Sequence, residues 1–242
     1  MAHGFPDWGQ TAGVNTVYQL KDLAELAVRL GSIDAFDRRG DVIFLEDFER
    51  GDSKFITDKG GLNAATYLSL LHCKSGNFSL NLVAGSTLAV YARYAKSLGV
   101  PLLSRIGVEL SFASGAFAGY FDIGVSVRDG SKVHSFHIRL DVAAKELKVF
   151  DDTGAWVTIA TDIALEYSDD LFHTIKVVGD IKTNEYVRVI LNSSVYVISG
   201  IKMWNAAAIA SPYCTLEVTN TGVIASNVSM FIDDIILTQN EP

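Results

Sequence analysis

Residues 172–199, FHTIKVVGDIKTNEYVRVILNSSVYVIS, decide the fold. Apolar, β-branched and aromatic residues gather here in three short runs, at 175–178, 186–191 and 195–198. Gly179 and Asp180 separate the first two runs, and an Asn-Ser-Ser turn at 192–194 separates the last two. Alternating patterns bounded by Gly, Asn, Asp and Ser are typical of β-hairpins. The stretch predicts a three-stranded antiparallel meander whose apolar face must pack against a second sheet.

The chain from residue 42 onward repeats this pattern. Further strands are predicted at 42–49, 66–73, 77–83, 87–95, 106–112, 120–128, 133–140, 146–151, 156–160, 214–220 and 228–237. Many short strands separated by turn residues favour an antiparallel sandwich or barrel. The chain has 242 residues and no linker-like segment. We therefore expect one sandwich domain over residues 41–242, which is large enough to bury a core without a metal or a disulfide.

Residues 1–40 differ from the rest and predict an N-terminal arm. One short helix is expected within 17–30, where Leu20, Leu23, Ala24, Ala27 and Leu30 share one face and Gly31 ends the helix. The arm is too short to form its own core, so this stripe must dock on the sandwich or on another subunit. The residues predicted to serve assembly are Phe5, Trp8, Tyr18, Leu20, Leu23 and Leu30.

Composition narrows the classes of partner. A net charge of −8 with no cluster of Lys and Arg argues against nucleic acid. No window approaches the roughly 20 apolar residues of a membrane helix, and the first residues lack the pattern of a signal peptide. Cys73 and Cys214 are predicted to be two free, buried thiols, with a single disulfide as the alternative.

Two segments at the ends of the predicted domain carry a family resemblance. LEDFERG at 45–51 and FIDDIILT at 231–238 resemble the first and last strands of concanavalin A-like and carbohydrate-module jelly rolls. DLFHTIKVVGDIKTNEYVRVILN at 170–192 resembles the laminin-G pattern of the same fold class. The resemblance implies an all-β, two-sheet antiparallel jelly-roll sandwich with the N-terminal arm. It also implies that the first and last strands lie side by side.

The combination of an arm and a jelly roll resembles virion proteins of tailed bacteriophages. This resemblance implies a non-enzymatic structural protein of a phage particle, serving in capsid decoration or in the tail or fibre. Such a protein is made in the host cytoplasm, resides in the virion, and assembles with itself or with other virion proteins. The alternative is a carbohydrate-binding or receptor-binding lectin-like module that recognises a cell-surface glycan. A glycoside hydrolase is the third possibility.

Acidic residues mark the junction of the first and last strands. If those strands pair, Glu46, Asp47, Glu49, Asp233 and Asp234 come together. Related carbohydrate modules hold a structural calcium ion near this junction, and carboxylate oxygens suit calcium. The resemblance therefore implies a possible calcium site at Glu46, Glu49, Asp233 and Asp234, although no cofactor is required. The alternative is that these carboxylates face water or cap turns.

The other candidate residues give weaker evidence of a catalytic, metal-binding or ligand-binding site. A glycosidase needs two carboxyl groups on either side of the scissile bond, whereas the acids at 46–49 are adjacent in sequence and Asp122 stands alone. His134 and His137 are three apart on a predicted strand, so they point to opposite faces. Among the aromatic residues, Trp204 is the best candidate for an exposed ligand contact. Core packing is the expected use of most others, a set that includes Tyr91, Tyr94, Tyr120, Tyr186 and Tyr196.

Overall fold

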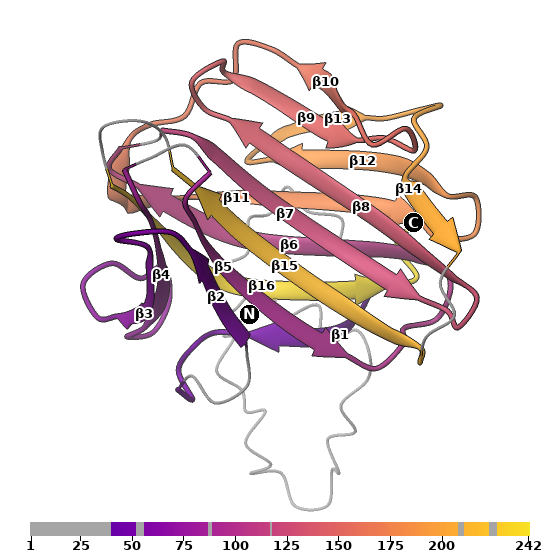
Figure 1. Ribbon diagram of the computed structural model, residues 1–242, viewed down its shortest axis with the longest axis horizontal. Helices are drawn as coiled ribbons and strands as arrows, with labels where there is room; N and C mark the ends of the chain where they lie inside the picture. Colours follow the sequence, from indigo (N-terminus) through magenta and orange to yellow (C-terminus); the bar gives the residue numbers. More distant parts are fainter. Residues whose placement is uncertain (1–39, 52–55, 87–88, 117, 208–210, 223–226) are drawn as a thin grey trace, which may run out of the picture.

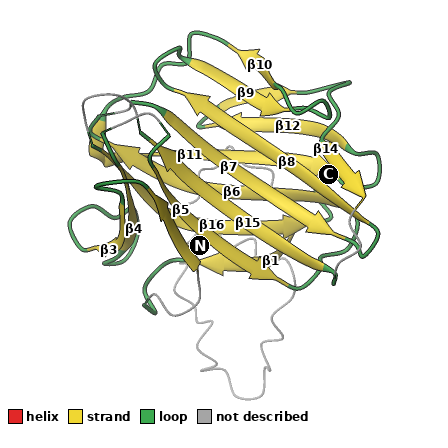
Figure 2. Cartoon of the chain, in the orientation of Figure 1, coloured by secondary structure: helices red, strands yellow, loops and turns green. Residues whose placement is uncertain are grey.

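The computed structural model describes residues 40–51, 56–86, 89–116, 118–207, 211–222 and 227–242. These residues form sixteen β-strands and no helix (Figure 2). No helix long and apolar enough to cross a membrane occurs in this part of the chain. The predicted arm helix and the six assembly residues lie outside the described residues.

The strands form two antiparallel sheets of eight strands each, layered one in front of the other (Figure 1). The first sheet contains, in spatial order, β13 (Ser194–Val197), β12 (Glu185–Leu191), β11 (Ser168–Asp180), β6 (Arg105–Ser114), β16 (Val228–Gln239), β4 (Ser79–Ala84) and β3 (Ala65–Ser69), with β1 (Asp41–Glu46) beside β16. The second contains β10 (Trp156–Ala160), β9 (Glu146–Phe150), β8 (Lys132–Asp141), β7 (Tyr120–Arg128), β15 (Tyr213–Thr221), β5 (Tyr91–Leu98) and β2 (Ile56–Gly60), with β14 (Trp204–Ala207) beside β8. The predicted two-sheet antiparallel sandwich is confirmed.

The core lies between the two sheets. Alternate residues of each strand point inward, as in β7, where Phe121, Ile123 and Val125 are at most 2% exposed. Tyr94 and Tyr186 are among the largest fully buried side chains, as the sequence predicted. Tyr91 and Tyr120 are only partly buried and do not belong to the core cluster, so they are exceptions to the core packing predicted for most aromatic residues.

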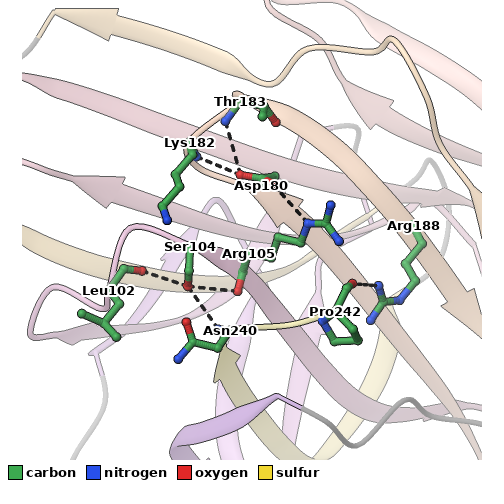
Figure 3. A network of polar contacts seen from close by, with 9 residues as sticks. All are labelled: Leu102, Ser104, Arg105, Asp180, Lys182, Thr183, Arg188, Asn240 and Pro242. Atoms are coloured by element: carbon green, nitrogen blue, oxygen red, sulfur yellow. Dashed lines mark hydrogen bonds and ion pairs between the residues drawn. The ribbon is translucent and has the colours of Figure 1, made fainter.

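The predicted meander is present as β11, β12 and β13. The first turn falls later than expected, because Gly179 and Asp180 still pair with β12. Asp180 Oδ1 accepts the backbone N–H groups of Lys182 and Thr183 and so closes the turn that follows (Figure 3).

Two strands, β2 and β3, depart from the sequence pattern. β2 was not predicted, since ITDKG lacks apolar alternation. β3 ends at Ser69, which leaves Leu70 and Leu71 exposed in the loop that follows. Cys73 lies in the same loop and is only partly buried, whereas Cys214 is fully buried in β15, and both thiols are free.

The first and last strands pair as predicted. β1 runs antiparallel to the second half of β16, with Phe44 opposite Leu237 and Glu46 opposite Ile235. The first half of β16 pairs instead with β4. β1 and β4 therefore share one edge of β16, and each pairs with a different half of that strand.

A bulge in β16 separates the two halves. Its pairing with β6 shifts register between Asp233 and Ile236, and Asp234 has a positive φ of 48°. Asp233 Oδ2 accepts the N–H groups of Lys74 and Ser75 at 2.9 and 3.1 Å. Lys74 Nζ lies 3.5 Å from Asp234 Oδ2. The loop between β3 and β4 thus supplies both the donors and the cation for these buried carboxyl groups.

The C-terminal residues close the opposite end of the first sheet. The buried Glu241 carboxylate lies 2.7 Å from both Lys176 Nζ and Arg188 Nη2. Thr238 Oγ1 donates to the same carboxylate. Nearby, Arg188 donates to the Pro242 carbonyl, and the Asn240 N–H donates to Ser104 Oγ (Figure 3).

Glu241→Ala is predicted to lower the free energy of unfolding by about 3–5 kcal/mol, because it removes the carboxylate from two buried cations. The control is Arg105→Ala, which removes the pair with Asp180 from a side chain that is 44% exposed. That change should cost no more than about 1 kcal/mol. Chemical unfolding of the three proteins measures both values. Equal losses in the two variants would contradict the prediction.

The raised pKa of Asp233 predicts that the stability of the fold depends on pH. Burial raises the pKa of Asp233 to about 7, and the negative charge of Asp234 acts in the same direction. The unfolded chain loses this proton near pH 4 and the folded chain near pH 7, so raising the pH across this window favours unfolding.

Asp233→Asn removes this titration. The difference in free energy of unfolding between the two proteins should therefore shift in favour of the variant as the pH rises from about 4 to about 7. Urea unfolding at several pH values measures the shift. A difference that is constant over this range would show that the prediction is wrong.

Candidate functional site

The outer face of the second sheet carries the candidate site. In β7 the inward positions are apolar, so Tyr120, Asp122 and Gly124 point outward. In β8 the register places Arg139 opposite Asp122 and His137 opposite Gly124. Outward side chains of neighbouring strands therefore stand in rows that cross the sheet.

One row is polar from edge to edge, and we call it the polar row. It takes one residue from each of seven strands in turn. Its members, from β10 to β2, are Thr158, Lys148, Arg139, Asp122, Thr219, Arg93 and Asp58. Six spacings of about 4.8 Å give the row a length of roughly 29 Å.

The Asp122–Arg139 pair stands at the centre of the polar row. Arg139 Nε and Nη2 donate to the two Asp122 oxygens at 2.7 Å each. Burial raises the pKa of Asp122, and the hydrogen bonds from Arg139 oppose that rise. Two N–H donors, one on each oxygen, fit an ionised carboxylate. The pair therefore forms a fixed polar element in the sheet surface.

Aromatic rings hold the Arg139 guanidinium from both sides. Its central carbon lies 4.4 Å from the centroid of Tyr120 and 4.1 Å from the centroid of Trp156. These distances are those of cation–π contacts. The two rings are partly exposed, and they stand on opposite sides of the polar row.

The aromatic side of the row continues from Trp156 to Phe150 and His137. The ring centroids of Phe150 and Trp156 are 5.2 Å apart, and those of His137 and Phe150 are 6.1 Å apart. A Cβ atom at Gly124 would overlap the His137 ring, so this glycine is what lets the ring lie flat on the sheet. Burial lowers the pKa of His137 to about 4, so the ring is neutral near pH 7.

Tyr186 of the first sheet fixes this aromatic side from below. Its side chain crosses the core, and its hydroxyl oxygen accepts the N–H of His137 at 2.9 Å. It also lies within hydrogen-bond distance of the carbonyl oxygens of His137 and Phe150. The backbones of β8 and β9 are therefore held at the point where the aromatic rings emerge.

The end of the polar row at β5 and β2 also combines an ion pair with an aromatic ring. Arg93 Nη2 lies 2.7 Å from Asp58 Oδ2, and its Nη1 lies 3.7 Å from Glu217. Tyr91 flanks the row and donates to Asp58 Oδ2 at 3.2 Å. Gly60 lies under the Tyr91 ring, where a side chain would collide with it.

The predicted ligand residue Trp204 lies elsewhere on this sheet. It begins β14 and pairs with Ser135, away from the polar row. It sits in a strand and is partly buried, whereas the sequence suggested an exposed loop position. Ser135 is two residues from His137 on the same outward face, so Trp204 stands one row beyond the aromatic residues that flank the polar row.

The four predicted metal residues gather only in part. Asp233 and Asp234 adjoin each other, but Glu49 accepts the N–H groups of Asn77 and Phe78. Glu46 accepts the N–H of Phe48. No three His, Cys, Asp or Glu side chains in the described ranges are placed to hold a metal ion. Calcium binding stays a prediction, which the unfolding temperature in a chelator would test.

The polar row could not be predicted from the sequence, and the reason is physical. Alternation shows that Tyr120 and Asp122 share a face, but it does not identify their neighbours on other strands. Asp122 and Arg139 are 17 residues apart, and Thr219 joins them only through the order of the strands. The available signal was the set of alternating polar residues in 120–128 and 132–141.

No protein-family model and no curated protein sequence matches the chain. Among solved structures, the chain is similar to the cellulose-induced protein Cip1, with 14% identity, a TM-score of 0.54, and coverage of 81% of this chain and 96% of that chain. It is similar to an endo-β-1,4-glucuronan lyase from the fungus Trichoderma reesei, with 9% identity, a TM-score of 0.53, and coverage of 82% and 96%.

A sialidase matches over 81% of this chain and 18% of its own, with 10% identity and a TM-score of 0.52. This chain therefore corresponds to a small part of that sialidase. The likenesses confirm the predicted fold, a concanavalin A-like jelly-roll sandwich.

Proposed function

We propose that the protein is a carbohydrate-binding module that holds an extended glycan along the polar row. The observation that carries the proposal is the polar row itself, with aromatic rings on both sides. Sugar hydroxyls both donate and accept hydrogen bonds, which matches guanidinium, carboxylate and threonine groups. The C–H faces of sugar rings are apolar and pack on aromatic rings.

The length of the row favours a chain of sugars over a single one. A row of roughly 29 Å crosses seven strands, and an aromatic residue stands near each end. Trp156 marks one end and Tyr91 the other. A similar fold in a glucuronan lyase adds support, since that enzyme acts on a polysaccharide.

The ion pairs on this face favour binding over hydrolysis. A glycosidase needs a carboxyl group that holds a proton near neutral pH. Asp122 and Asp58 are instead each paired with an arginine at 2.7 Å, and Asp141 is paired with Lys148. For Asp58, the hydrogen bond from Tyr91 and the charge of Arg93 lower the pKa, so this carboxylate stays ionised near neutral pH and cannot act as the acid.

The expected role in a phage particle stays a prediction. It rests on the arm, which lies outside the described residues.

Tyr91→Ala and Trp156→Ala should each weaken glycan binding by about 1–2 kcal/mol, or roughly five- to thirtyfold in affinity. The matched control is Tyr67→Ala, an aromatic residue of β3 in the other sheet that is 51% exposed. Calorimetry with soluble β-glucan, xylan, galactan and glucuronan measures the affinities. The proposal fails if no polysaccharide in this panel binds, or if all three variants lose affinity equally.

The charges in and beside the polar row predict a preference among glycans. Three cations, Lys148, Arg139 and Arg93, stand among five carboxylates, Asp58, Asp122, Asp141, Glu146 and Glu217. This excess of negative charge repels a polyuronate. Neutral polysaccharides should therefore bind more tightly than glucuronan at low salt, with a smaller difference at high salt. Tighter binding of glucuronan would reverse this expectation.

A further inference from the structure

A second row of short polar side chains crosses the outer face of the second sheet, and we call it the hydroxyl row. It takes one residue from each of four neighbouring strands. Its members, from β8 to β5, are Ser135, Ser126, Thr215 and Ser97. Thr215 lies between Cys214 and Leu216 of the core cluster, so the row points away from the core. Every member carries a hydroxyl group and none carries a charge, whereas ion pairs predominate in the polar row.

Trp204 stands at the β14 end of the hydroxyl row. It pairs directly with Ser135, and its neighbour Met203 belongs to the core cluster, so the Trp204 side chain lies on the outer face. It is partly exposed there. The hydroxyl groups of Ser135 and Ser126, next in the row, are 2.7 Å apart. An aromatic ring followed by hydroxyl groups matches a sugar, which has an apolar C–H face and hydroxyl groups at its rim.

The aromatic residues beside the polar row continue to Trp204 along one edge of β8. β7 occupies the other edge of β8 over its whole length, so β9 and β14 must share this one. β9 ends with Phe150 in ring contact with His137, and β14 begins with Trp204 opposite Ser135. His137 and Ser135 are two residues apart, or about 6.6 Å along the strand. Trp204 is therefore the next aromatic side chain along this edge.

The surface between the polar row and the hydroxyl row is low. In β7, Gly124 lies between Asp122 of the polar row and Ser126 of the hydroxyl row. The His137 ring occupies the space that a Cβ atom at Gly124 would need. Asp122 and Ser126 are four residues apart, or about 13 Å along the strand. At β7 and β8, a glycine and a flat ring therefore separate the two rows, without an upright side chain between them.

We propose that Trp204 and the hydroxyl row hold a neutral sugar branch of the glycan whose main chain lies along the polar row. The inference rests on the proposed function and narrows its ligand to branched polysaccharides. The main chain crosses the strands, whereas the branch runs along β7 and β8 over Gly124 and His137. Trp204 packs on the apolar face of the branch sugar, and Ser126 and its neighbours in the row exchange hydrogen bonds with its hydroxyl groups.

The dimensions of the hydroxyl row favour a branch over a second parallel chain. The row crosses three strand spacings, or about 14 Å, which is half the length of the polar row. Its aromatic residue stands at one end only, on the side where Trp156 and Phe150 flank the polar row. The branch sugar is neutral because the row offers no cation that would compensate an acidic sugar for its lost hydration.

Paired glycans test the proposal. The polysaccharide that binds most tightly in calorimetry is compared with a form of the same backbone that carries neutral single-sugar branches, such as xyloglucan for β-glucan, arabinoxylan for xylan or arabinogalactan for galactan. The branched form should bind about three- to tenfold more tightly, which is the gain from one aromatic contact. A branched form that binds no more tightly would overturn the inference and leave the proposed function intact. If neither form binds, the proposed function fails as well.

Three variants locate the branch. Trp204→Ala should lower the affinity for the branched form to that for the unbranched form. Its affinity for the unbranched form should stay unchanged, which also shows that the variant is folded. Trp156→Ala, beside the polar row, should weaken both forms equally, and Tyr67→Ala in the other sheet should weaken neither. A preference for the branched form that persists in Trp204→Ala would overturn the inference.

Ser126→Ala tests the hydroxyl row with all aromatic residues in place. It removes one hydroxyl group and should lower the affinity for the branched form about two- to tenfold, with no change for the unbranched form. An equal loss for both forms, in this variant or in Trp204→Ala, would place these residues under the main chain and would overturn the inference.

Discussion

The register between β7 and β8 is the constraint on which both the core and the candidate site depend. Ile123 and Ile138 meet on the inner face, and Asp122 meets Arg139 on the outer face. A slip of one residue would turn one strand over relative to the other, burying one member of the ion pair and exposing the isoleucine of that strand. The energy of burying apolar side chains therefore also sets the positions of the polar ones. Stability and the geometry of the polar row are consequences of the same pairing.

Tyr186 extends this dependence across the sandwich. It belongs to β12 of the first sheet, yet its hydroxyl bonds to the backbone of β8 and β9. A buried hydroxyl without partners is costly, so these bonds fix where the two sheets stand relative to each other. The aromatic side of the polar row therefore depends on a residue that is itself fully buried.

The elements that the sequence predicted best depend on local information. β7 and β10 have the predicted bounds, because each is an uninterrupted run flanked by strong turn residues. β2 was missed because its residues carry no apolar alternation, and its partner β5 lies some thirty residues further on in the chain. The pairing of β1 with β16 was found through family resemblance, since no local pattern joins strands at the two ends of a domain. The polar row depends on strand order, which a single sequence does not contain.

Gly124 determines the shape of the outer face because it has no side chain. Because no side chain stands at this position, the His137 ring settles onto the strand and brings Phe150 within ring contact. A methyl group there would lift the histidine and tilt the rings beside it, although the methyl itself would lie beneath them. The contour of the sheet surface can therefore be altered from a position that no ligand touches, so that relatives with the same visible side chains could still differ in the ligands they accept.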